Sequence, residues 1–245
     1  MIEKAVPTVP VEPWREPFPW LVAGITRRAT GLQRPNFGLF TDLPACEAMD
    51  AWERLATDVG AQAAVHARQV HGREIAMHAP GPGGSGALTI TGPVDGHITT
   101  RRGLLLTVTV ADCVPVYVVD PARKAVGLFH AGWRGAAAGI LEAGLEALGS
   151  HFGSDASDCR VHLGVSICGD CYEVGSEVFD ALEQEPGATL DLREALRKRA
   201  VKSGIPESAV TIDTACTLCH QERFFSHRGG DPGRQVAFLM MRDPA

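Results

Sequence analysis

The stretch from Leu104 to Gly135 constrains the fold of this chain most. It holds three short segments rich in Val, Leu and Thr, over 104–110, 114–119 and 125–129, a composition typical of β-strands. The residues between the last two segments, 120–123, have the composition of a turn. We therefore predict an antiparallel hairpin preceded by a further strand.

The register of this hairpin decides which side chains meet. If Pro121 and Ala122 are the two central turn residues, Cys113 and His130 face each other with Cβ atoms roughly 5 Å apart. One metal ion can bridge a thiolate and an imidazole over that distance. Pro121 suits a type I or II turn better than the primed turns of tight hairpins, and a slip of one residue would separate the two side chains. The register is therefore open at this point.

The order of the other elements indicates the fold class. A chain of 245 residues with 45% hydrophobic and 21% charged residues fits one globular domain. Strands and helices alternate without a regular βαβ rhythm, which favours an α/β (α+β) layered sandwich with mixed β-sheets. We expect residues 1–18, which are rich in Pro, to form an extended arm, and residues 19–245 to form the single domain.

The hydrophobic pattern after Trp133 changes to a helical period. Ile140, Leu141, Leu145 and Leu148 share one helical face, and Gly149 is the expected stop. Further helices are predicted over 174–182 and 190–202, and strands over 160–167, 209–212 and 235–241.

Charge and composition limit the partners. The chain has 23 basic and 29 acidic residues, a net charge of −6, which disfavours a nucleic-acid partner. There is no apolar run near 20 residues long, and the start lacks the apolar core of a signal peptide, so we expect no membrane span and a cytoplasmic protein. Its seven cysteines are then expected to be reduced thiols. No obligate protein partner is evident.

Three side chains form a candidate metal site. His71 precedes Gly72, and it joins Cys113 and His130 as two imidazoles and one thiolate. Three protein ligands leave a fourth position open, as in a catalytic zinc site. A cysteine in a strand is more often a small apolar side chain, and spacing alone favours that simpler interpretation.

Arg134 offers a site for an anion. It stands with Gly135 at the start of the helix after His130, where free N–H groups and a guanidinium attract negative charge. A surface ion pair is an equally good explanation of this arginine.

Eight short motifs are spread over nearly the whole chain. They are Asn36-Phe37-Gly38-Leu39, Gln69-Val70-His71-Gly72, Val94-Asp95-Gly96, Ala111-Asp112-Cys113-Val114-Pro115-Val116, His130-Ala131-Gly132-Trp133-Arg134-Gly135, Cys171-Tyr172-Glu173-Val174-Gly175, Phe224-Phe225-Ser226-His227-Arg228 and Gly233-Arg234-Gln235. Together they resemble the signature of one known family, the laccase-domain (polyphenol-oxidase-like) purine nucleoside phosphorylases, and the resemblance is most specific in the middle of the chain.

The resemblance implies one Zn²⁺ per chain, held by His71, Cys113 and His130, with copper less expected. It implies phosphorolysis of adenosine, inosine, guanosine and methylthioadenosine to the base and ribose 1-phosphate, and deamination of adenosine. Purine nucleosides and phosphate are then the partners. His227 and Gly229 stand where the family commonly has an aromatic residue and a second arginine, which leaves the preferred nucleoside open.

The resemblance also suggests roles for further residues. Deamination needs an activated water and a carboxylate that carries protons. Asp95, Asp112 and Glu173 are the candidates, and Asp112 has the alternative role of orienting an imidazole. The expected contacts to substrate or phosphate are Arg134, Gln69, Asn36, Phe225 and Arg228.

Two C-x-x-C pairs, Cys168 with Cys171 and Cys216 with Cys219, have the spacing of half zinc sites. A dithiol redox role is a second possibility. Because Cys171 and Cys216 fall on the motifs above, we favour packing near the active site over a second zinc.

Two other classes of enzyme use the same side chains. A metal-free cysteine hydrolase would take Cys113 as nucleophile and His130 or His71 as base. A copper-dependent polyphenol oxidase would need a different histidine pattern, because multicopper oxidases rely on H-x-H pairs and the nine histidines here form none.

Overall fold

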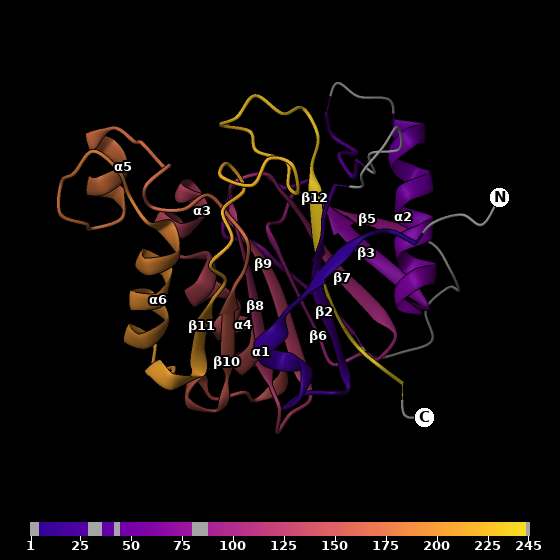
Figure 1. The fold of residues 1–245 in the computed structure, drawn as a ribbon. Helices are drawn as coiled ribbons and strands as arrows, with labels where there is room; N and C mark the ends of the chain where they lie inside the picture. The colour runs from indigo at the N-terminus through magenta and orange to yellow at the C-terminus, as the bar shows by residue number, and fades with distance from the viewer. Residues whose placement is uncertain (1–4, 29–35, 42–44, 80–87, 244–245) are drawn as a thin grey trace.

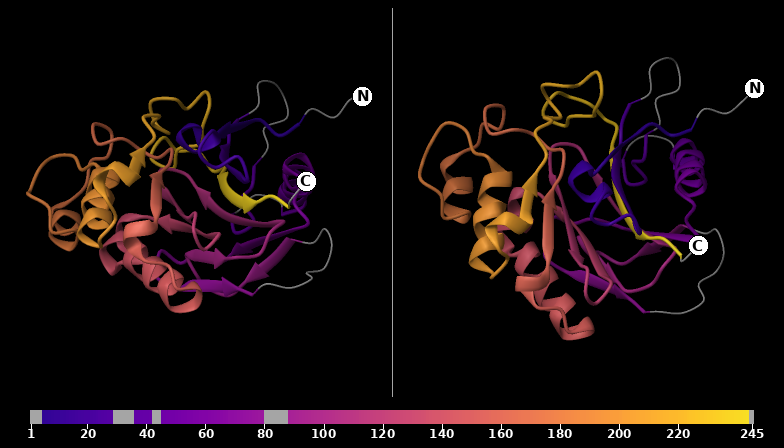
Figure 2. Two further views of the ribbon diagram at one scale, coloured as in Figure 1. Left: turned by 90° about the horizontal axis from the view of Figure 1, so that it is seen from below. Right: turned by 60° about the horizontal axis from the view of Figure 1, so that its bottom comes forward.

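Two β-sheets packed face to face form the centre of the protein, and helices cover their outer faces (Figures 1 and 2). The structure is a computed structural model and describes residues 5–28, 36–41, 45–79 and 88–243. Both sheets contain parallel and antiparallel pairs. The expected layered α/β sandwich with mixed sheets in one domain is confirmed.

The first sheet has the strand order β1-β2-β12-β7-β3-β5. Helix α2 (Ala45–Val59) packs on its outer face, where Trp52 and Leu55 contact Leu105 and Phe238. The strands are β1 (Thr8–Pro10), β2 (Leu21–Thr26), β12 (Gln235–Met241), β7 (Leu104–Val110), β3 (Ala63–Ala67) and β5 (Leu88–Thr91).

The second sheet has the order β11-β10-β8-β9-β6-β4. Helices α4 (Ile140–Phe152), α5 (Ser176–Ala181) and α6 (Leu192–Lys202) cover its outer face through Leu141, Phe179 and Leu196. The strands are β11 (Val210–Ile212), β10 (Arg160–Leu163), β8 (Val114–Asp120), β9 (Ala125–Ala131), β6 (Gly96–Thr99) and β4 (Ile75–His78).

The alternation of side chains along each strand builds the layers. In β7, Leu106 and Val108 point between the sheets, whereas Leu105 points toward α2. Tyr117 also lies between the sheets, and its hydroxyl donates to the carbonyl of Gly24, so the buried polar group is satisfied.

The hairpin of β8 and β9 differs from the expected register by two residues. Pro115 lies opposite His130, and the turn has four residues. Asp120 sets this turn, because its Oδ1 accepts from the N–H groups of Ala122 and Arg123, and Lys124 closes it with φ 51°. A shift by two residues leaves each side chain on its expected face, so Cys113 and His130 stay on one side of the hairpin.

The helix after β9 also differs from expectation. Gly139, with φ 88°, separates α3 (Trp133–Ala138) from α4. Helix α4 continues through Gly149, the expected stop, and ends at Gly153, whose φ of 69° favours glycine. At the N-terminal side, β1 is extended as expected, but Glu12–Arg15 forms one helical turn, α1, with the Trp14 side chain buried.

Two glycines of α4 give a matched test of its packing. A Cβ on Gly144 would lie 2.2 Å from Cζ of Phe129, whereas a Cβ on Gly149 meets only the carbonyl of Ser154, at 3.3 Å. We expect Gly144→Ala to lower the free energy of unfolding by about 1–3 kcal/mol, despite alanine's better helix propensity. Gly149→Ala is the control, expected within about 1 kcal/mol of the parent protein. Urea denaturation checks both, and equal stabilities would contradict the packing of Gly144 on Phe129.

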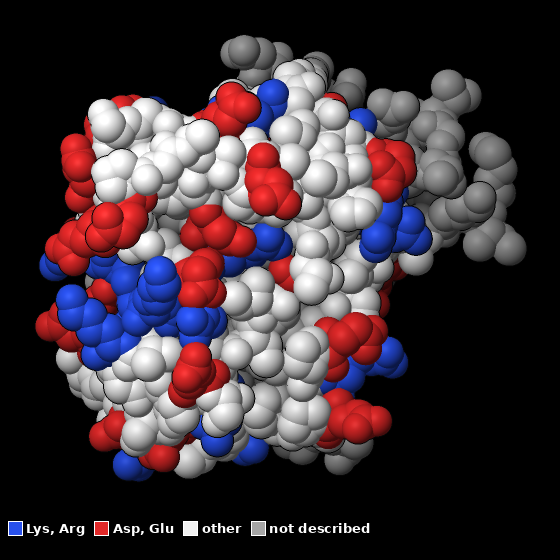
Figure 3. All heavy atoms as spheres, turned by 60° about the vertical axis from the view of Figure 1, so that its left-hand side comes forward, with Lys and Arg blue, Asp and Glu red and all other residues white. Residues whose placement is uncertain are grey.

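Basic and acidic side chains are mixed on the face that carries α6 (Figure 3). Arg197 pairs with Glu194 and Glu207, and Arg199 pairs with Glu142 of α4. These basic residues of α6 are therefore neutralised locally. Within the described ranges, no helix has the length and apolar character that a membrane crossing requires.

Candidate metal centre

The candidate metal centre lies where the chain passes from one sheet to the other. His71 is on the connection from β3 to β4, and Cys113 is on the connection from β7 to β8. His130 is near the end of β9. Both connections leave the first sheet and enter the second, so the topology itself brings the three residues to one edge of the interface between the sheets.

The three side chains converge on one point. Their ligand atoms lie within 4.8 Å of one another. The rings of His71 and His130 have centroids 4.8 Å apart and an interplanar angle of 78°. His130 is buried, Cys113 is half-buried and His71 is exposed. Two imidazole nitrogens and one thiolate are ligands that zinc prefers, so the residues fit the metal that the sequence predicts.

Asp95 organises this centre. Its Oδ1 lies 2.8 Å from Nδ1 of His130 and accepts from the N–H of His71, and its Oδ2 accepts from the N–H groups of Val70 and Gly72. The carboxylate is buried at the start of β6. The bond to Nδ1 leaves Nε2 of His130 free to bind a metal, which is the usual role of a carboxylate behind a ligating histidine.

Opposite charges stabilise the ligands before any metal binds. Burial opposes ionisation of the Cys113 thiol, but the positive charge of His130 and hydrogen bonds from His130 and His71 lower its pKa to about 6. Burial also opposes charging of His130, yet the Cys113 thiolate and Asp95 raise the pKa of His130 to about 9. The pKa of Asp95 is lowered, since the hydrogen bonds from His130 and the N–H of Gly72 outweigh burial. The thiol is therefore readily converted to the ligating thiolate.

Two glycines at the start of α3 leave room for the ligands. A Cβ on Gly132 would lie 2.9 Å from Cδ2 of His71 and 3.0 Å from Sγ of Cys113. A Cβ on Gly135 would lie 2.9 Å from the carbonyl oxygen of Gly72. A side chain at position 132 would press on the candidate ligands His71 and Cys113, and one at position 135 would press on the backbone next to His71.

A cavity of about 320 Å³ opens onto the three ligands. Its walls come from the loop after Phe37, the ends of β3 and β7, and the loop before β12. They comprise Gly38, Leu39, Phe40, Thr41, Ala67, Gln69, His71, Thr109, Ala111, Cys113, His130, His227 and Arg234. The ligands thus line the cavity together with an exposed aromatic ring, Phe40, and a guanidinium, Arg234.

Asp112 holds the walls together rather than contacting an imidazole. Its Oδ1 accepts from the hydroxyls of Thr217 and Ser226, and its Oδ2 accepts from the N–H of Arg228. Its backbone has φ 84°. The bond to an imidazole that was considered for Asp112 is made by Asp95, whose carboxylate contacts Nδ1 of His130.

Gln69 and Asn36 are also engaged by the backbone. Gln69 lines the cavity, but its side-chain amide bonds the N–H, hydroxyl and carbonyl of Thr109. Oδ1 of Asn36 accepts from the N–H groups of Gly38 and Arg234, and so joins two walls of the cavity.

A second group of predicted residues surrounds Tyr172. Burial raises the pKa of Tyr172 to about 12; the negative charges of Cys113 and Asp112 add to this, while Arg228 and Arg134 act in the opposite direction. The Arg228 guanidinium lies 5.4 Å from the ring centroid of Tyr172. Arg134 and Arg228 are both exposed, so two cationic side chains lie near Tyr172, on the same side of the centre as Cys113.

Glu173 and Phe225 lie outside the cavity lining, as do the predicted residues Asn36, Asp95, Asp112, Arg134 and Arg228. Glu173 is exposed and pairs through its backbone with Thr189. Phe225 is buried under the guanidinium of Arg28, at 4.3 Å, and its N–H donates to Gln235.

Sequence reasoning did not select Phe40, Arg234 and Tyr172 as site residues. Tyr172 and Arg234 lie within two of the motifs that resemble the family, so the sequence did contain a signal for these two residues. Phe40 follows directly after another such motif, and neither its type nor its spacing distinguishes it.

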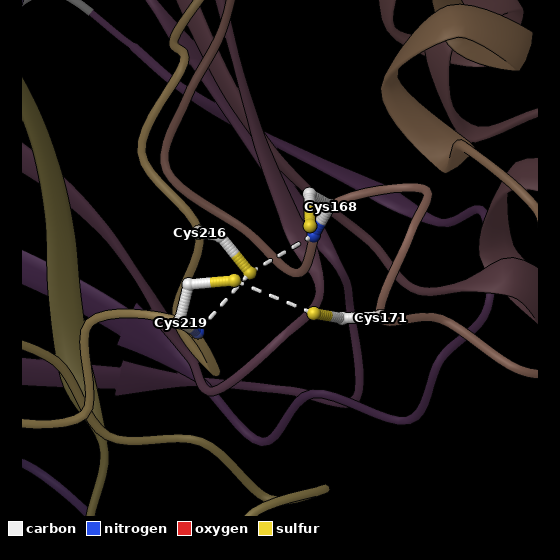
Figure 4. A group of neighbouring side chains, drawn as sticks. All are labelled: Cys168, Cys171, Cys216 and Cys219. Carbon is white, nitrogen blue, oxygen red and sulfur yellow. Dashed lines mark hydrogen bonds between the residues drawn. The ribbon is translucent and has the colours of Figure 1, made fainter.

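The four cysteines of the C-x-x-C pairs form a second cluster. Their Sγ atoms lie within 4.8 Å of one another (Figure 4). This cluster is separate from the three-ligand centre, and the packing interpretation favoured above does not explain why all four sulfurs meet.

Fold and site together define a class of protein: a four-layer sandwich with a His₂Cys centre at the edge between its two sheets. The chain belongs to the family described as multi-copper polyphenol oxidoreductase laccase, which matches residues 23–242.

Two similar proteins are named as enzymes, and a crystal structure is known for one of them. The chain is 34% identical over 253 residues to purine nucleoside phosphorylase YlmD of Geobacillus stearothermophilus, covering 93% of this chain and 92% of that protein. It is 34% identical over 149 residues to adenosine deaminase RL5 of an unknown prokaryotic organism, covering 55% and 56%. The crystal structure of YlmD from Geobacillus stearothermophilus superposes with a TM-score of 0.85 at 31% identity, covering 98% of both chains.

Proposed function

We propose that this protein is a zinc-dependent purine nucleoside phosphorylase that also deaminates adenosine. The observation that carries the proposal is the convergence of His71, Cys113 and His130 at a cavity large enough for a small ligand. Membership of a family with relatives named purine nucleoside phosphorylase and adenosine deaminase supports it. Adenosine, inosine, guanosine and methylthioadenosine, each with phosphate, are the proposed substrates of phosphorolysis.

His71, Cys113 and His130 would hold the zinc, and Asp95 would keep His130 in the tautomer that binds it. When bound, a zinc with three protein ligands supplies a Lewis acid with an open position. We assign Asp95 and Asp112 as positioning residues, because each oxygen of both carboxylates already accepts at least one hydrogen bond. Glu173 is then the remaining candidate to carry a proton.

The cationic residues beside Tyr172 would bind phosphate. Arg134 and Arg228 are exposed and both act on the Tyr172 hydroxyl, next to Cys113. Guanidinium groups suit phosphate because their donors match its oxygens in pairs. On the other side, Phe40 offers a ring for a purine base to stack on, with His227 and Arg234 nearby in the lining.

We propose zinc rather than copper because of the side chains that line the centre and the histidine pattern of the sequence. A blue-copper site adds a weak axial ligand such as Met, and no Met lines the described cavity. The absence of H-x-H pairs in the sequence argues against a multicopper cluster. We also propose a cytoplasmic location, in which the cysteines would stay reduced.

The test is metal analysis of the purified protein combined with release of base from inosine and adenosine. We expect zinc in the protein and release of hypoxanthine and adenine that depends on added phosphate. Base release that does not respond to phosphate would replace phosphorolysis by hydrolysis. Phenol oxidation on reconstitution with copper, without action on nucleosides, would reject the proposal.

Arg134→Ala tests the phosphate site. We expect the KM for phosphate to rise about 10-fold or more, while the KM for inosine changes little, because a charge-assisted contact contributes about 1.5–3 kcal/mol. Initial rates at varied phosphate and fixed inosine give the first value. Arg160, a half-buried arginine at the start of β10 whose guanidinium donates to the carbonyls of Asp158 and Cys159, provides the control variant Arg160→Ala. An unchanged phosphate KM would place the anion elsewhere.

One observation favours a second candidate function. The Cys113 thiol has its pKa lowered to about 6 beside His130, as a nucleophilic cysteine requires. A metal-free cysteine hydrolase would retain its activity after chelation, whereas we expect every activity of this protein to be lost with the metal.

A further inference from the structure

The two C-x-x-C pairs meet because the strands before them are parallel. Strand β10 pairs with β11 in parallel, with Leu163 opposite Ile212. The segments after both strands therefore leave the same edge of the sheet. They continue side by side: Ser166 bridges to Cys216, and the N–H of Thr217 donates to the carbonyl of Ser166. This places residues 168–171 next to residues 216–219.

The four sulfurs have the arrangement of a tetrahedral ligand shell. All Sγ atoms lie within 4.8 Å of one another, and those of Cys171 and Cys219 are 3.4 Å apart. A tetrahedral zinc with Zn–S distances of about 2.3 Å separates its sulfurs by about 3.8 Å. Figure 4 shows two cysteines from each segment facing a common centre.

Backbone groups support this arrangement. The N–H of Cys219 and the N–H of Cys168 both point at Sγ of Cys216, at 3.4 and 3.3 Å. Such bonds favour a thiolate over a thiol, because the sulfur then accepts from two donors. One of these donors belongs to the other C-x-x-C segment, so the two turns are built as one unit.

We propose that Cys168, Cys171, Cys216 and Cys219 bind a structural zinc ion, distinct from the metal at His71, Cys113 and His130. Four thiolates complete a tetrahedral shell and leave no open position, so this metal has no direct part in the reaction. Packing alone is a poorer explanation, because Cys219 is exposed, whereas cysteines that serve as small apolar side chains are buried. A single disulfide would use two sulfurs and leave two without a role.

The proposed zinc would fix two segments that lie next to the candidate metal centre. Cys171 precedes Tyr172, and Cys216 precedes Thr217, whose hydroxyl bonds Asp112 beside Cys113. Asp112 in turn bonds the N–H of Arg228. A metal that joins the two segments therefore fixes Tyr172, and through Asp112 the loop of Arg228, relative to the three-ligand centre.

Zinc content per chain tests the proposal directly. Protein purified in the presence of a thiol reductant is expected to contain two zinc ions, one for each cluster. Cys219→Ser and Cys171→Ser should each lose one and keep the other. Cys113→Ala should also lose one, but from the other centre, so the two losses are additive in the double variant Cys113→Ala/Cys219→Ser. Cys46→Ser, which alters an exposed cysteine outside both clusters, is the matched control and should keep both.

A conservative exchange separates metal binding from a disulfide or from packing. Histidine is a zinc ligand and cannot form a disulfide, so Cys219→His should retain the zinc that Cys219→Ser loses. Loading with Co²⁺ gives a second measurement, since thiolate-to-cobalt absorption grows with the number of thiolate ligands. Most of it should remain in Cys113→Ala, whereas Cys219→Ser should keep only the weaker absorption of the single Cys113 thiolate. Neither measurement depends on the nucleoside activity.

Three results would overturn the proposal. The first is a zinc content of the parent protein that Cys171→Ser and Cys219→Ser leave unchanged. The second is a Cys171–Cys219 disulfide in protein isolated under reducing conditions, found by thiol counting and mass spectrometry. The third is equal zinc loss in Cys219→His and Cys219→Ser while both remain folded. Because Cys113→Ala reports on the other centre, a failure here is distinguishable from a failure of the proposed catalytic zinc.

Discussion

Cys113→Ala is expected to remove the metal from the His71–Cys113–His130 centre and to abolish phosphorolysis and deamination together. Among the described residues, the proposed centre has three protein ligands, of which the Cys113 thiolate is one, and two imidazoles alone would not hold a zinc with comparable strength. Loss of a partner behind a ligand already costs about 10–100-fold in affinity or activity, so loss of a ligand should cost more than about 100-fold in each rate. Zinc analysis and both assays on the same preparation check this.

The fold should survive this substitution. Cys113 is half-buried and lies in a loop, so truncation removes little packing. We expect the metal-free variant to fold, with a free energy of unfolding about 1–3 kcal/mol below that of the metal-free parent protein, because His130 loses its hydrogen bond with the Cys113 thiolate. Cys46→Ser serves again as the control for loss of a thiol. Retention of zinc at this centre by Cys113→Ala would remove Cys113 from the ligand set, and retention of one activity without the other would show that the two activities use different sites.

Asp95→Asn is expected to damage both the metal centre and the fold. The carboxylate accepts three backbone N–H groups and bonds Nδ1 of His130. An amide of the same shape offers one oxygen, and its NH₂ group would face donors that it cannot satisfy. A buried donor left without a partner costs about 1–3 kcal/mol, so the free energy of unfolding should fall by about 2–5 kcal/mol. Zinc affinity should fall about 10–100-fold, because His130 loses the group that fixes its tautomer.

Competition with a chelator measures the affinity, and urea denaturation measures the stability. Asp155→Asn is the matched control: Oδ1 of Asp155 accepts from the N–H and the hydroxyl of Ser157 in an exposed turn, where an asparagine oxygen accepts equally well. This variant should leave the zinc affinity unchanged and the free energy of unfolding close to that of the parent protein. An Asp95→Asn protein with the affinity of the parent would show that the carboxylate holds the loop but does not tune the ligand.

The sequence alone predicted that Cys113 and His130 lie close together, and the physical reason for that prediction holds in the structure. A hairpin brings its two strands together whatever its turn, and an error of two residues in register does not move a side chain to the other face. His71 was added to them on its residue type and its place before Gly72, and the family resemblance strengthened that choice. No local pattern places it next to them, since its position depends on the connection from β3 to β4 between two different sheets. Local patterns do not specify how sheets pair or pack.

Other features depended on pairings that the sequence does not show. The parallel alignment of β10 with β11 joins residues 49 positions apart, as in the pair Leu163–Ile212, and nothing near either C-x-x-C pair indicates it. The bonds of Asp112 to Thr217 and Ser226 span more than 100 residues. Composition also gave no reason to choose Asp95 over Asp112 as the partner of a histidine, because both precede or follow short strands and only the packed structure separates their neighbours.

The bonds of Asp95 bear on whether folding or metal binding comes first at this centre. One carboxylate shapes the His71 loop through its backbone and orients His130 through its side chain, and both interactions exist without any metal. The ligands at the cavity are thus prearranged by the polypeptide, and ion uptake is a late step that occurs on a folded chain. Protein without metal at this centre should therefore be a stable, refoldable species, and the supply of zinc to this centre should set how much of the protein is active rather than how much of it folds.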